Sequence, residues 1–284
     1  MKGLVRSIGS GVLIIIGSIL IGSLPGLFQS IHLNGKSYIK TVKMVCEHLT
    51  HPSLMTYTIN GITRSIFPMI FSQWFYSLIL LFCGFCVAIG LATLLAFGTM
   101  LLPRPVIRVI KGVLFFLEAI PDLLIIITIQ LIVISVYQHT HTKLFDIYSF
   151  SHPIYVLPIL TLSILPAIMI YRMLVVEIEE EESKHYVDLA KSKGLGKTTI
   201  LFRHIFRNTL IKTLTHAHTI LFFMLSNLLI VEIAYNSSGL LNYVYENMSP
   251  DLLTFALFLF LIPMVIFLSL CRFVIKRVTG ANGA

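Results

Sequence analysis

The stretch KSKGLGKTTILFRHIFRN, from Lys191 to Asn208, contains GLGKTT, which matches the final G-K-[ST] of a phosphate-binding P-loop. A complete P-loop needs glycine five residues before Gly196, and Lys191 occupies that position. It also needs a buried β-strand in front, whereas the preceding ESKHYVDLA is charged and favours a helix. The stretch therefore argues against an ATP-binding α/β domain. The sequence on either side of it indicates the fold class.

The rest of the chain is more apolar than a soluble protein. Of its 284 residues, 56% are hydrophobic and 12% are charged, the latter about half the share in soluble proteins, and the mean hydropathy is +0.90. Apolar runs of about 20 residues, enough for a helix to cross about 30 Å of hydrocarbon, recur along the chain. Since an open chain can satisfy its backbone groups in lipid only as helices, the sequence predicts an all-α integral membrane protein.

Six transmembrane helices are expected, in a single domain over residues 1–284. The first is expected to stay uncleaved, because its apolar run is too long for a signal-peptide core and no A-x-A-like site follows it. The expected spans are Ile8–Phe28, Phe71–Leu101, Val113–Tyr137, Ile154–Val176, Ile211–Tyr235 and Leu252–Ile275.

Basic residues set the expected orientation. With the N-terminus inside, 16 of the 21 Lys and Arg residues fall in segments that face the cytoplasm, which predicts that both termini are cytoplasmic. The net charge of +8 then follows from topology and does not indicate nucleic-acid binding. Residues 29–70 are expected to form an extracytoplasmic loop with a short helix near Ser37–Leu49, and residues 177–212 a cytoplasmic loop between spans four and five.

The 177–212 loop is expected to form a helix, a glycine turn and a second helix. Ser183 is the expected N-cap of the first helix, and Gly194 lies where a left-handed C-cap would fall. The second helix is expected from Thr198 through Arg207. The first helix should have an apolar contact face made of Tyr186, Val187, Leu189 and Ala190.

The stretch YVDLAKSKGLGKTTILFRHIFRN resembles the cytoplasmic E-A-A-x-x-x-G signature of bacterial ABC-importer permeases, in the form found in the oligopeptide/dipeptide/nickel family. Asp188-Leu189-Ala190 stands for E-A-A and is followed at the family's spacing by Gly194. Ser192 replaces an alanine of the family pattern, and Lys212 stands where the family usually has proline. The other matching positions are Tyr186, Val187, Lys193, Leu195, Arg203, His204, Arg207 and Asn208.

Three further motifs resemble the same family. Ala119-Ile120-Pro121 is similar to its S-I-P motif, and Pro25-Gly26 to the P-G that follows its first span. VEIAY, from Val231 to Tyr235, with Gly239-Leu240 after it, is similar to V-V-E-T-V-F…P-G-L-G. The departures from these motifs are Ser238 in place of proline, Asn242 in place of glycine, and no Asp after Pro25-Gly26.

The resemblance implies a permease subunit of an ATP-driven peptide importer in the bacterial cytoplasmic membrane. In this family the short helix docks in a groove of a cytoplasmic ATPase, and closure of two ATPases rocks a permease pair between inward-open and outward-open states. The implied partners are a second similar permease, identical or different, two ABC ATPases and an extracytoplasmic substrate-binding protein. ATP and Mg would be held by the ATPases, so this chain would bind no cofactor and would not be an enzyme. The residues expected to couple to the ATPase are Tyr186, Val187, Asp188, Leu189, Ala190, Gly194, Leu195, His204 and Asn208.

Other transport functions stay open at this point. An ABC permease for nickel or another metal chelate, or for amino acids, would carry the same docking helix. A secondary transporter or channel driven by an ion gradient would need no ATPase, but it would need intramembrane ion sites or inverted repeats. No internal repeat is visible in the sequence.

Three acidic residues fall within or at the edges of apolar spans. A charge at such a position costs at least about 2.5–3.5 kcal/mol, so it usually faces a watery cavity or a partner. Glu118 and Asp122 are four apart and would repel on one helix face if Pro121 leaves the helix regular. They are candidates, with Pro121, for the translocation pathway; alternatively Glu118 pairs with Arg108 or Lys111. For Glu232 a structural role at the outer gate is favoured over ligand contact.

The remaining reactive side chains predict neither catalysis nor a metal site. Cys83 and Cys86 have C-x-x-C spacing but lie in an apolar helix, where free cysteine packs as a small hydrophobe. His139 and His141 would need two more ligands from elsewhere to hold a metal. We find no nucleophile–base motif of a hydrolase, and no metal ligand is assigned.

Overall fold

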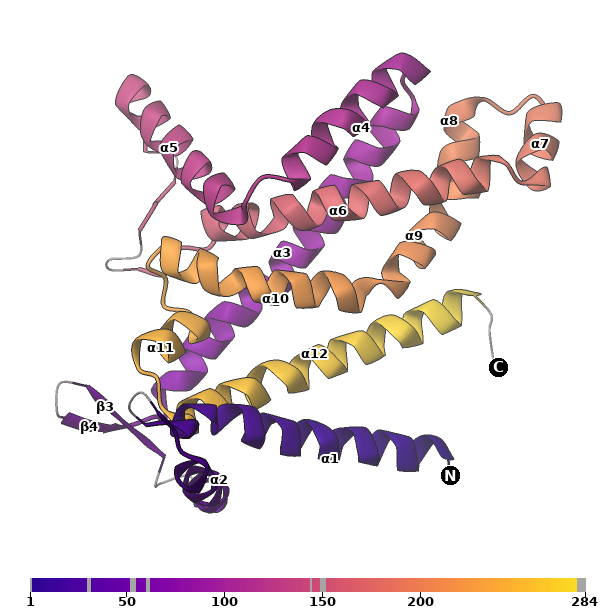
Figure 1. Cartoon of the computed structure of the whole chain (residues 1–284). Helices are drawn as coiled ribbons and strands as arrows, with labels where there is room; N and C mark the ends of the chain where they lie inside the picture. Colours follow the sequence, from indigo (N-terminus) through magenta and orange to yellow (C-terminus); the bar gives the residue numbers. More distant parts are fainter. Residues whose placement is uncertain are drawn as a thin grey trace. The chain divides into compact units, whose positions relative to one another are not determined.

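The computed structural model of the chain describes residues 2–29, 32–51, 55–59, 62–143, 145–148 and 152–279. Most of these residues are helical (Figure 1), as the apolar composition predicts. The chain forms two compact units, one of residues 1–78 with 238–266 and the other of residues 79–237 with 267–284. The helices α3 (Met69–Met100) and α12 (Pro250–Thr279) contribute to both units.

The first unit begins with α1 (Lys2–Gly22) and a 3-10 turn, η1 (Leu24–Leu27), which has proline near its start. The helix expected near Ser37–Leu49 is confirmed as α2 (Gly35–Thr50). Its N-cap is Asn34, whose side chain accepts hydrogen bonds from two backbone N–H groups of the first turn. Residues 30–31, 52–54 and 60–61 of the expected 29–70 loop lie outside the described part of the chain.

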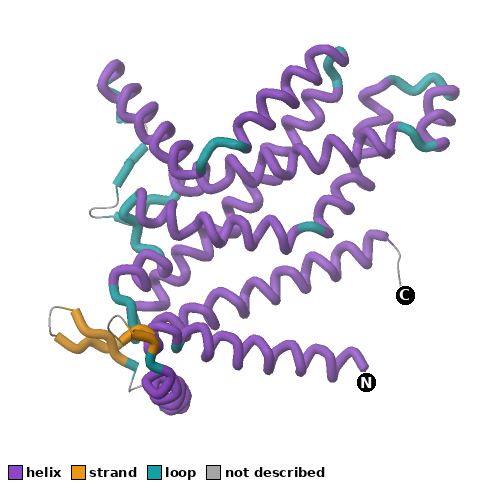
Figure 2. Tube along the Cα trace, viewed as in Figure 1, coloured by secondary structure: helices purple, strands orange, loops and turns teal. Residues whose placement is uncertain are grey.

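Two short antiparallel hairpins flank α2, and the sequence pattern does not predict them (Figure 2). Each is too small to alter the all-α character of the fold. Their strands are β1 (Phe28–Gln29) with β2 (His32–Leu33), and β3 (Thr56–Ile59) with β4 (Ile62–Ser65).

Polar contacts between segments far apart in sequence hold the first unit together. The His48 ring on α2 lies 2.7 Å from the Asp251 carboxylate at the start of α12. The Trp74 indole N–H on α3 donates to the carbonyl of Leu259 at 2.7 Å. The short helix α11 (Leu240–Glu246) completes this unit.

Gly22 marks a close approach between the end of α1 and α12. A Cβ added there would lie 2.0 Å from Oγ1 and 2.7 Å from Cα of Thr254. The Cα cannot move aside as a side chain can, so small residues are what allow membrane helices to pack at this distance.

We therefore expect Gly22→Ala to reduce the yield of monodisperse, folded chain severalfold, measured by fluorescence-detected size exclusion. Gly17→Ala in the same helix is the matched control, because a Cβ there meets nothing within 4 Å. Equal yields for the two variants would contradict the close packing of α1 on α12.

The second unit is built around α6 (Val156–Glu182). In the most apolar stretch of α6, 61% of the residues are buried, whereas the share is 39% in the next most buried candidate span. The helix α6 is therefore the core helix of this unit. It packs mainly against α10 (Ala217–Ala234) and α9 (Phe206–Thr215). The other elements of the unit are α4 (Arg104–Glu118), α5 (Asp122–Thr140), α7 (His185–Ser192), α8 (Lys197–Ile200) and a single π-helical turn, η3 (Leu201–Ile205).

Among the described residues, five helices are long and apolar enough to cross a membrane: α3, α5, α6, α10 and α12. Six spans were expected, and the remaining one corresponds to α1, which holds the shorter apolar stretch Leu13–Gly22. The expected span Ile211–Tyr235 also includes the end of α9, which is separated from α10 at His216.

The prediction of a single helix over Val113–Tyr137 is wrong. The chain forms α4 up to Glu118, a short connection, and α5 from Asp122. Pro121 explains the break, because it has no N–H to donate and disfavours helical backbone in the residue before it. The backbone of Pro121 is extended, with ψ of 137°.

Candidate functional site

The first helix of the 177–212 loop is α7, and it ends in a glycine cap. Gly194 has a φ of +74°, a conformation that side chains with a Cβ disfavour. Its N–H donates to the Lys191 carbonyl at 2.9 Å, and the Leu195 N–H donates to the Ala190 carbonyl at 3.3 Å. This pair of bonds is a Schellman cap. The left-handed C-cap expected at Gly194 is confirmed.

The N-cap expected at Ser183 is wrong. The acidic run EIEEEE extends α6 through Glu182, and Ser183 ends that helix with its hydroxyl bonded to the Glu180 carbonyl at 2.7 Å. Lys184, in extended conformation, is the residue that precedes α7. The acidic residues that predict the start of a new helix therefore belong to the end of α6.

The apolar side chains of α7 do not form the single contact face that the sequence predicts. Val187 is 0% and Ala190 5% exposed, so both are buried within this chain. Leu189 is 62% exposed. Asp188 and Lys191, also exposed, form an ion pair at 3.2 Å. One side of α7 is therefore fixed to its own chain, and the side with Leu189 is free for a partner.

A buried carboxylate ties the start of α7 to α6. Glu181 is 1% exposed and accepts hydrogen bonds from Lys184 and from the Tyr186 hydroxyl. Burial, and then the hydrogen bond to the Glu181 carboxylate, raise the pKa of Tyr186 to about 12. Tyr186 is also hydrogen-bonded to the Asn208 side chain. Tyr186 and Asn208, which both match the family pattern, are 22 positions apart in the sequence, and the structure brings them into contact.

Lys212 joins α9 to the same carboxylate. Its Nζ lies 3.1 Å from Glu177, 3.4 Å from Glu180 and 3.2 Å from Glu181. The contact with Glu177 is an ion pair that lacks hydrogen-bond geometry. Partial burial alone would lower the pKa of Lys212, but the carboxylates of Glu177 and Glu181 outweigh it and raise that pKa. The lysine that replaces the family's proline is therefore matched by the acidic end of α6.

We expect Lys212→Gln to destabilise this junction by about 2 kcal/mol, because the buried Glu181 loses a charged partner. The thermal unfolding midpoint of the purified chain should fall for Lys212→Gln. For Lys212→Arg, which retains the positive charge, the midpoint should stay close to that of the unchanged chain. Lys191→Gln is the control, because both side chains of the Lys191–Asp188 ion pair are exposed and such a pair contributes little to the free energy of unfolding. A midpoint for Lys212→Gln that equals the Lys191→Gln value would contradict the role of Lys212.

The second half of the loop begins at Lys197, one residue before the expected start, and continues beyond Arg207 to Thr215. It contains the π turn η3, a form often found at functional sites. Phe202 stacks on Phe97 of α3, and Phe206 meets the same ring edge-on, both with centroids 4.9 Å apart. His204 is half-buried, whereas Leu195 and Asn208 are exposed.

The break at Pro121 separates the two carboxylates expected to share a helix face. Glu118 ends α4, where Arg172 of α6 donates to it at 2.9 Å. The alternative pairing of Glu118 with Arg108 or Lys111 is therefore wrong, and Lys111 instead contacts Glu179 at 2.6 Å.

Asp122 begins α5 and is hydrogen-bonded to the Asn227 side chain on α10. A second polar contact joins the same two helices, because the Gln130 amide donates to the Ala234 carbonyl at 2.9 Å. Glu232, also on α10, is fully buried. The contacts of Asp122 and Gln130 thus form a polar line along which α5 lies against α10.

Several of these residues were missed from the sequence. Arg172 had been counted only as a topological charge, and Asn227 lies within an apolar span without a recognisable motif. A polar side chain inside an apolar span is itself a signal, because such residues usually have a partner. Within the described residues, no group of three or more His, Cys, Asp or Glu side chains is placed to hold a metal ion.

The family profile described as "Binding-protein-dependent transport system inner membrane component" matches residues 88–280. The chain belongs to this family. The matched region includes all of the candidate coupling and pathway residues. The permease is therefore an all-α, multi-pass inner-membrane component of an ABC importer, as the resemblance in the sequence predicts.

The permease is also similar to individual proteins. It is 33% identical over 85 residues to the peptide transport system permease protein SapB of Salmonella typhimurium, a match that covers 30% of this chain and 26% of SapB. The chain thus spans about a quarter of that relative's length. A solved structure of the MetNI methionine ABC transporter in inward-facing conformations has a TM-score of 0.50 and 14% identity, covering 76% of the permease and 94% of the solved chain. At this identity the likeness shows the fold alone.

Proposed function

We propose that the permease forms half of the translocation pathway of an ATP-driven peptide importer, with the 177–212 loop and both termini in the cytoplasm. The family supports transport that depends on a binding protein, and the SapB relative is named for peptides. The distribution of Lys and Arg supports the orientation. The complex would contain a second permease, two ABC ATPases that bind ATP and Mg, and an extracytoplasmic substrate-binding protein.

The two-sided character of α7 is the observation that carries this proposal. Its Val187 and Ala190 side is buried in the permease, and Leu189 is exposed beside the Asp188–Lys191 pair. An ATPase that grips the exposed side would move α7 as one piece, because the Gly194 cap closes its end. Through Glu181 and Lys212 the movement would reach α6 and α9 together.

For the pathway we propose the polar line between α5 and α10. Asp122 would contact the passing peptide, with Pro121 fixing the start of α5 and Glu232 holding the outer end of α10. Glu118, paired with Arg172 between α4 and α6, would flank the pathway near the start of α5. Charged and polar residues within spans are typical of such pathways.

We expect Leu189→Asp to abolish co-purification of the ATPase subunits while the permease still folds, because 62% of Leu189 is exposed. Pull-down from membranes and the thermal unfolding midpoint measure the two effects. Leu195→Asp should weaken the same co-purification less, since Leu195 is less exposed, at 37%, and lies beyond the helix. Undiminished ATPase binding by Leu189→Asp would contradict the docking surface.

The function itself is tested with the co-purified complex in proteoliposomes. We expect accumulation of labelled peptides only when ATP and the binding protein are both present. Accumulation by the permease alone under a proton or sodium gradient would overturn the ATP-driven mechanism. Uptake of a nickel chelate or an amino acid in place of peptides would overturn only the assignment of peptides as the cargo.

A further inference from the structure

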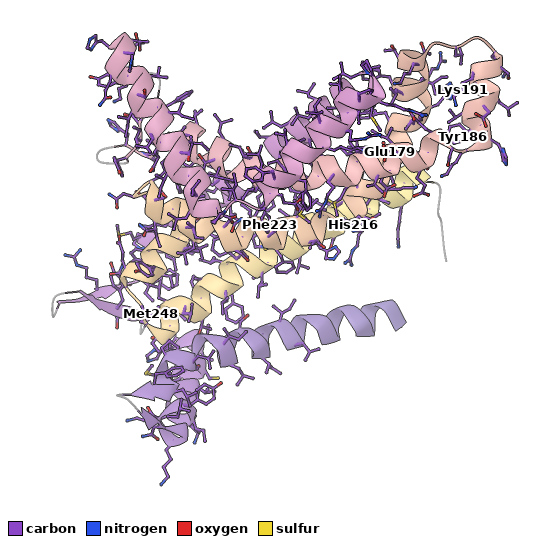
Figure 3. The ribbon with its side chains drawn as sticks, turned by 45° about the horizontal axis from the view of Figure 1, so that its top comes forward. Glu179, Tyr186, Lys191, His216, Phe223 and Met248 are labelled. Carbon is purple, nitrogen blue, oxygen red and sulfur yellow. The ribbon has the colours of Figure 1, made fainter. Side chains whose placement is uncertain are left out.

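A basic cavity of about 470 Å³ lies where α3 ends and α4 begins, beside the ends of α6 and α8. Its charged lining consists of Arg104, Arg108, Lys111, Lys197, Glu179 and Glu182. Glu179, labelled in Figure 3, marks the α6 side. None of these residues takes part in the coupling contacts of Glu181 and Lys212.

The charges around the cavity do not cancel. Lys111 is paired with Glu179 at 2.6 Å. In the described part of the chain, Arg104, Arg108 and Lys197 form no ion pair, and Glu182 is the one carboxylate left in the lining to oppose them. The cavity therefore has two positive charges in excess, two of its cations being guanidinium groups suited to hold phosphate oxygens in pairs.

The helix α4 that supplies most of these cations is amphipathic. Arg104, Arg108 and Lys111 are four and three residues apart, so they share one face. The opposite face consists of Val106, Val109, Val113 and Phe116, all exposed, and α4 has no buried residue. A helix with a basic face and an exposed apolar face is typical of the boundary between lipid headgroups and acyl chains.

We propose that this cavity binds the headgroup of an anionic phospholipid, whose acyl chains extend into the membrane beside α4. The concentration of basic residues at one membrane side accounts for positive charge there, but not for three unpaired cations around one cavity. Basic pockets between membrane helices bind anionic headgroups in this way. A soluble phosphate would use the same cations, but the exposed apolar face of α4 places the cavity at the membrane boundary, where lipid headgroups are concentrated.

The lipid site goes beyond the proposed function and does not depend on the cargo or on the ATPase. It is tested by native mass spectrometry of the purified full chain in neutral detergent with phosphatidylglycerol or with phosphatidylcholine of the same acyl chains. We expect selective retention of phosphatidylglycerol. The double variant Arg104→Gln/Arg108→Gln should weaken it about 30-fold, since each cation near a membrane contributes about fivefold.

The matched control is Lys193→Gln/Arg203→Gln, which removes the same charge from exposed positions outside the cavity. Lys197→Gln, from a different helix, should weaken binding about fivefold and serves if the double variant folds poorly. Equal retention of the two lipids, or equal phosphatidylglycerol binding by cavity and control variants, would overturn the proposal. Displacement of the lipid by millimolar inorganic phosphate would show a free-phosphate site and also overturn it. So would loss of ATPase co-purification with unchanged lipid binding, which would make the cavity a protein interface.

Discussion

Gly194→Val should lower ATP-dependent uptake at least tenfold while leaving the amount of permease in the membrane unchanged. A Cβ in the left-handed conformation costs about 1–2 kcal/mol, and a β-branched side chain costs more. The two cap bonds, from Gly194 to Lys191 and from Leu195 to Ala190, would be lost with that conformation. The end of α7 would then fray, and a push from an ATPase would not reach α6. Uptake and ATPase rates in proteoliposomes, normalised to permease content, measure the effect.

The same loop contains two controls for this variant. Gly194→Asn should retain most of the uptake, because asparagine tolerates the left-handed conformation. Gly196→Val should also be tolerated: Gly196 has an extended backbone with φ of −67°, and a Cβ there meets nothing within 4 Å. If Gly196→Val were as impaired as Gly194→Val, bulk in the loop rather than the cap would be the cause.

Charge reversal at Glu118 should reduce the membrane-inserted, folded permease about fivefold or more. Glu118→Arg places two guanidinium groups together between α4 and α6, and Arg172 lies in the span α6, where an unpaired charge costs about 2.5–3.5 kcal/mol. Arg172→Glu should have a similar effect for the same reason. The double variant Glu118→Arg/Arg172→Glu restores opposite charges and should recover at least half of the yield, measured by fluorescence-detected size exclusion from membranes.

The exposed pair of Lys143 and Asp146 provides the comparison for the charge reversal. Lys143→Glu should change the yield little, because an ion pair in water contributes at most about 1 kcal/mol. A double variant at Glu118 and Arg172 no better than either single variant would show that size or local backbone, not charge, limits those positions.

The family and the membrane class could be derived from the chain alone because they depend on local properties. Apolar runs of helical length predict spans whatever they pack against, and the spacing from Asp188 to Gly194 describes a short helix and its cap. The left-handed Gly194 followed from the same reasoning, since the cap bonds involve residues only three to five positions apart.

The positions of the breaks were harder to predict, because only Pro121 is a local cause and the other cause is a charge contact between segments far apart in sequence. The apolar run over Val113–Tyr137 predicts one continuous helix, but at Pro121 the structure has α4 and α5 as separate helices. The acidic run before Ser183 was assigned to the start of a helix, whereas its carboxylates extend α6. They do so because Lys212, about 30 residues later, supplies the opposing charge.

The local properties of the sequence are enough to derive an all-α membrane permease with a short helix that ends at Gly194. The packing of the helices is needed to see which side of α7 is exposed, which partner each carboxylate of the membrane helices has, and which cations surround one cavity. Glu118 with Arg172, Asp122 with Asn227 and Glu181 with Lys212 are contacts between helices. The pairing of charges depends on distance in space, and sequence separation does not give that distance until the helices have packed.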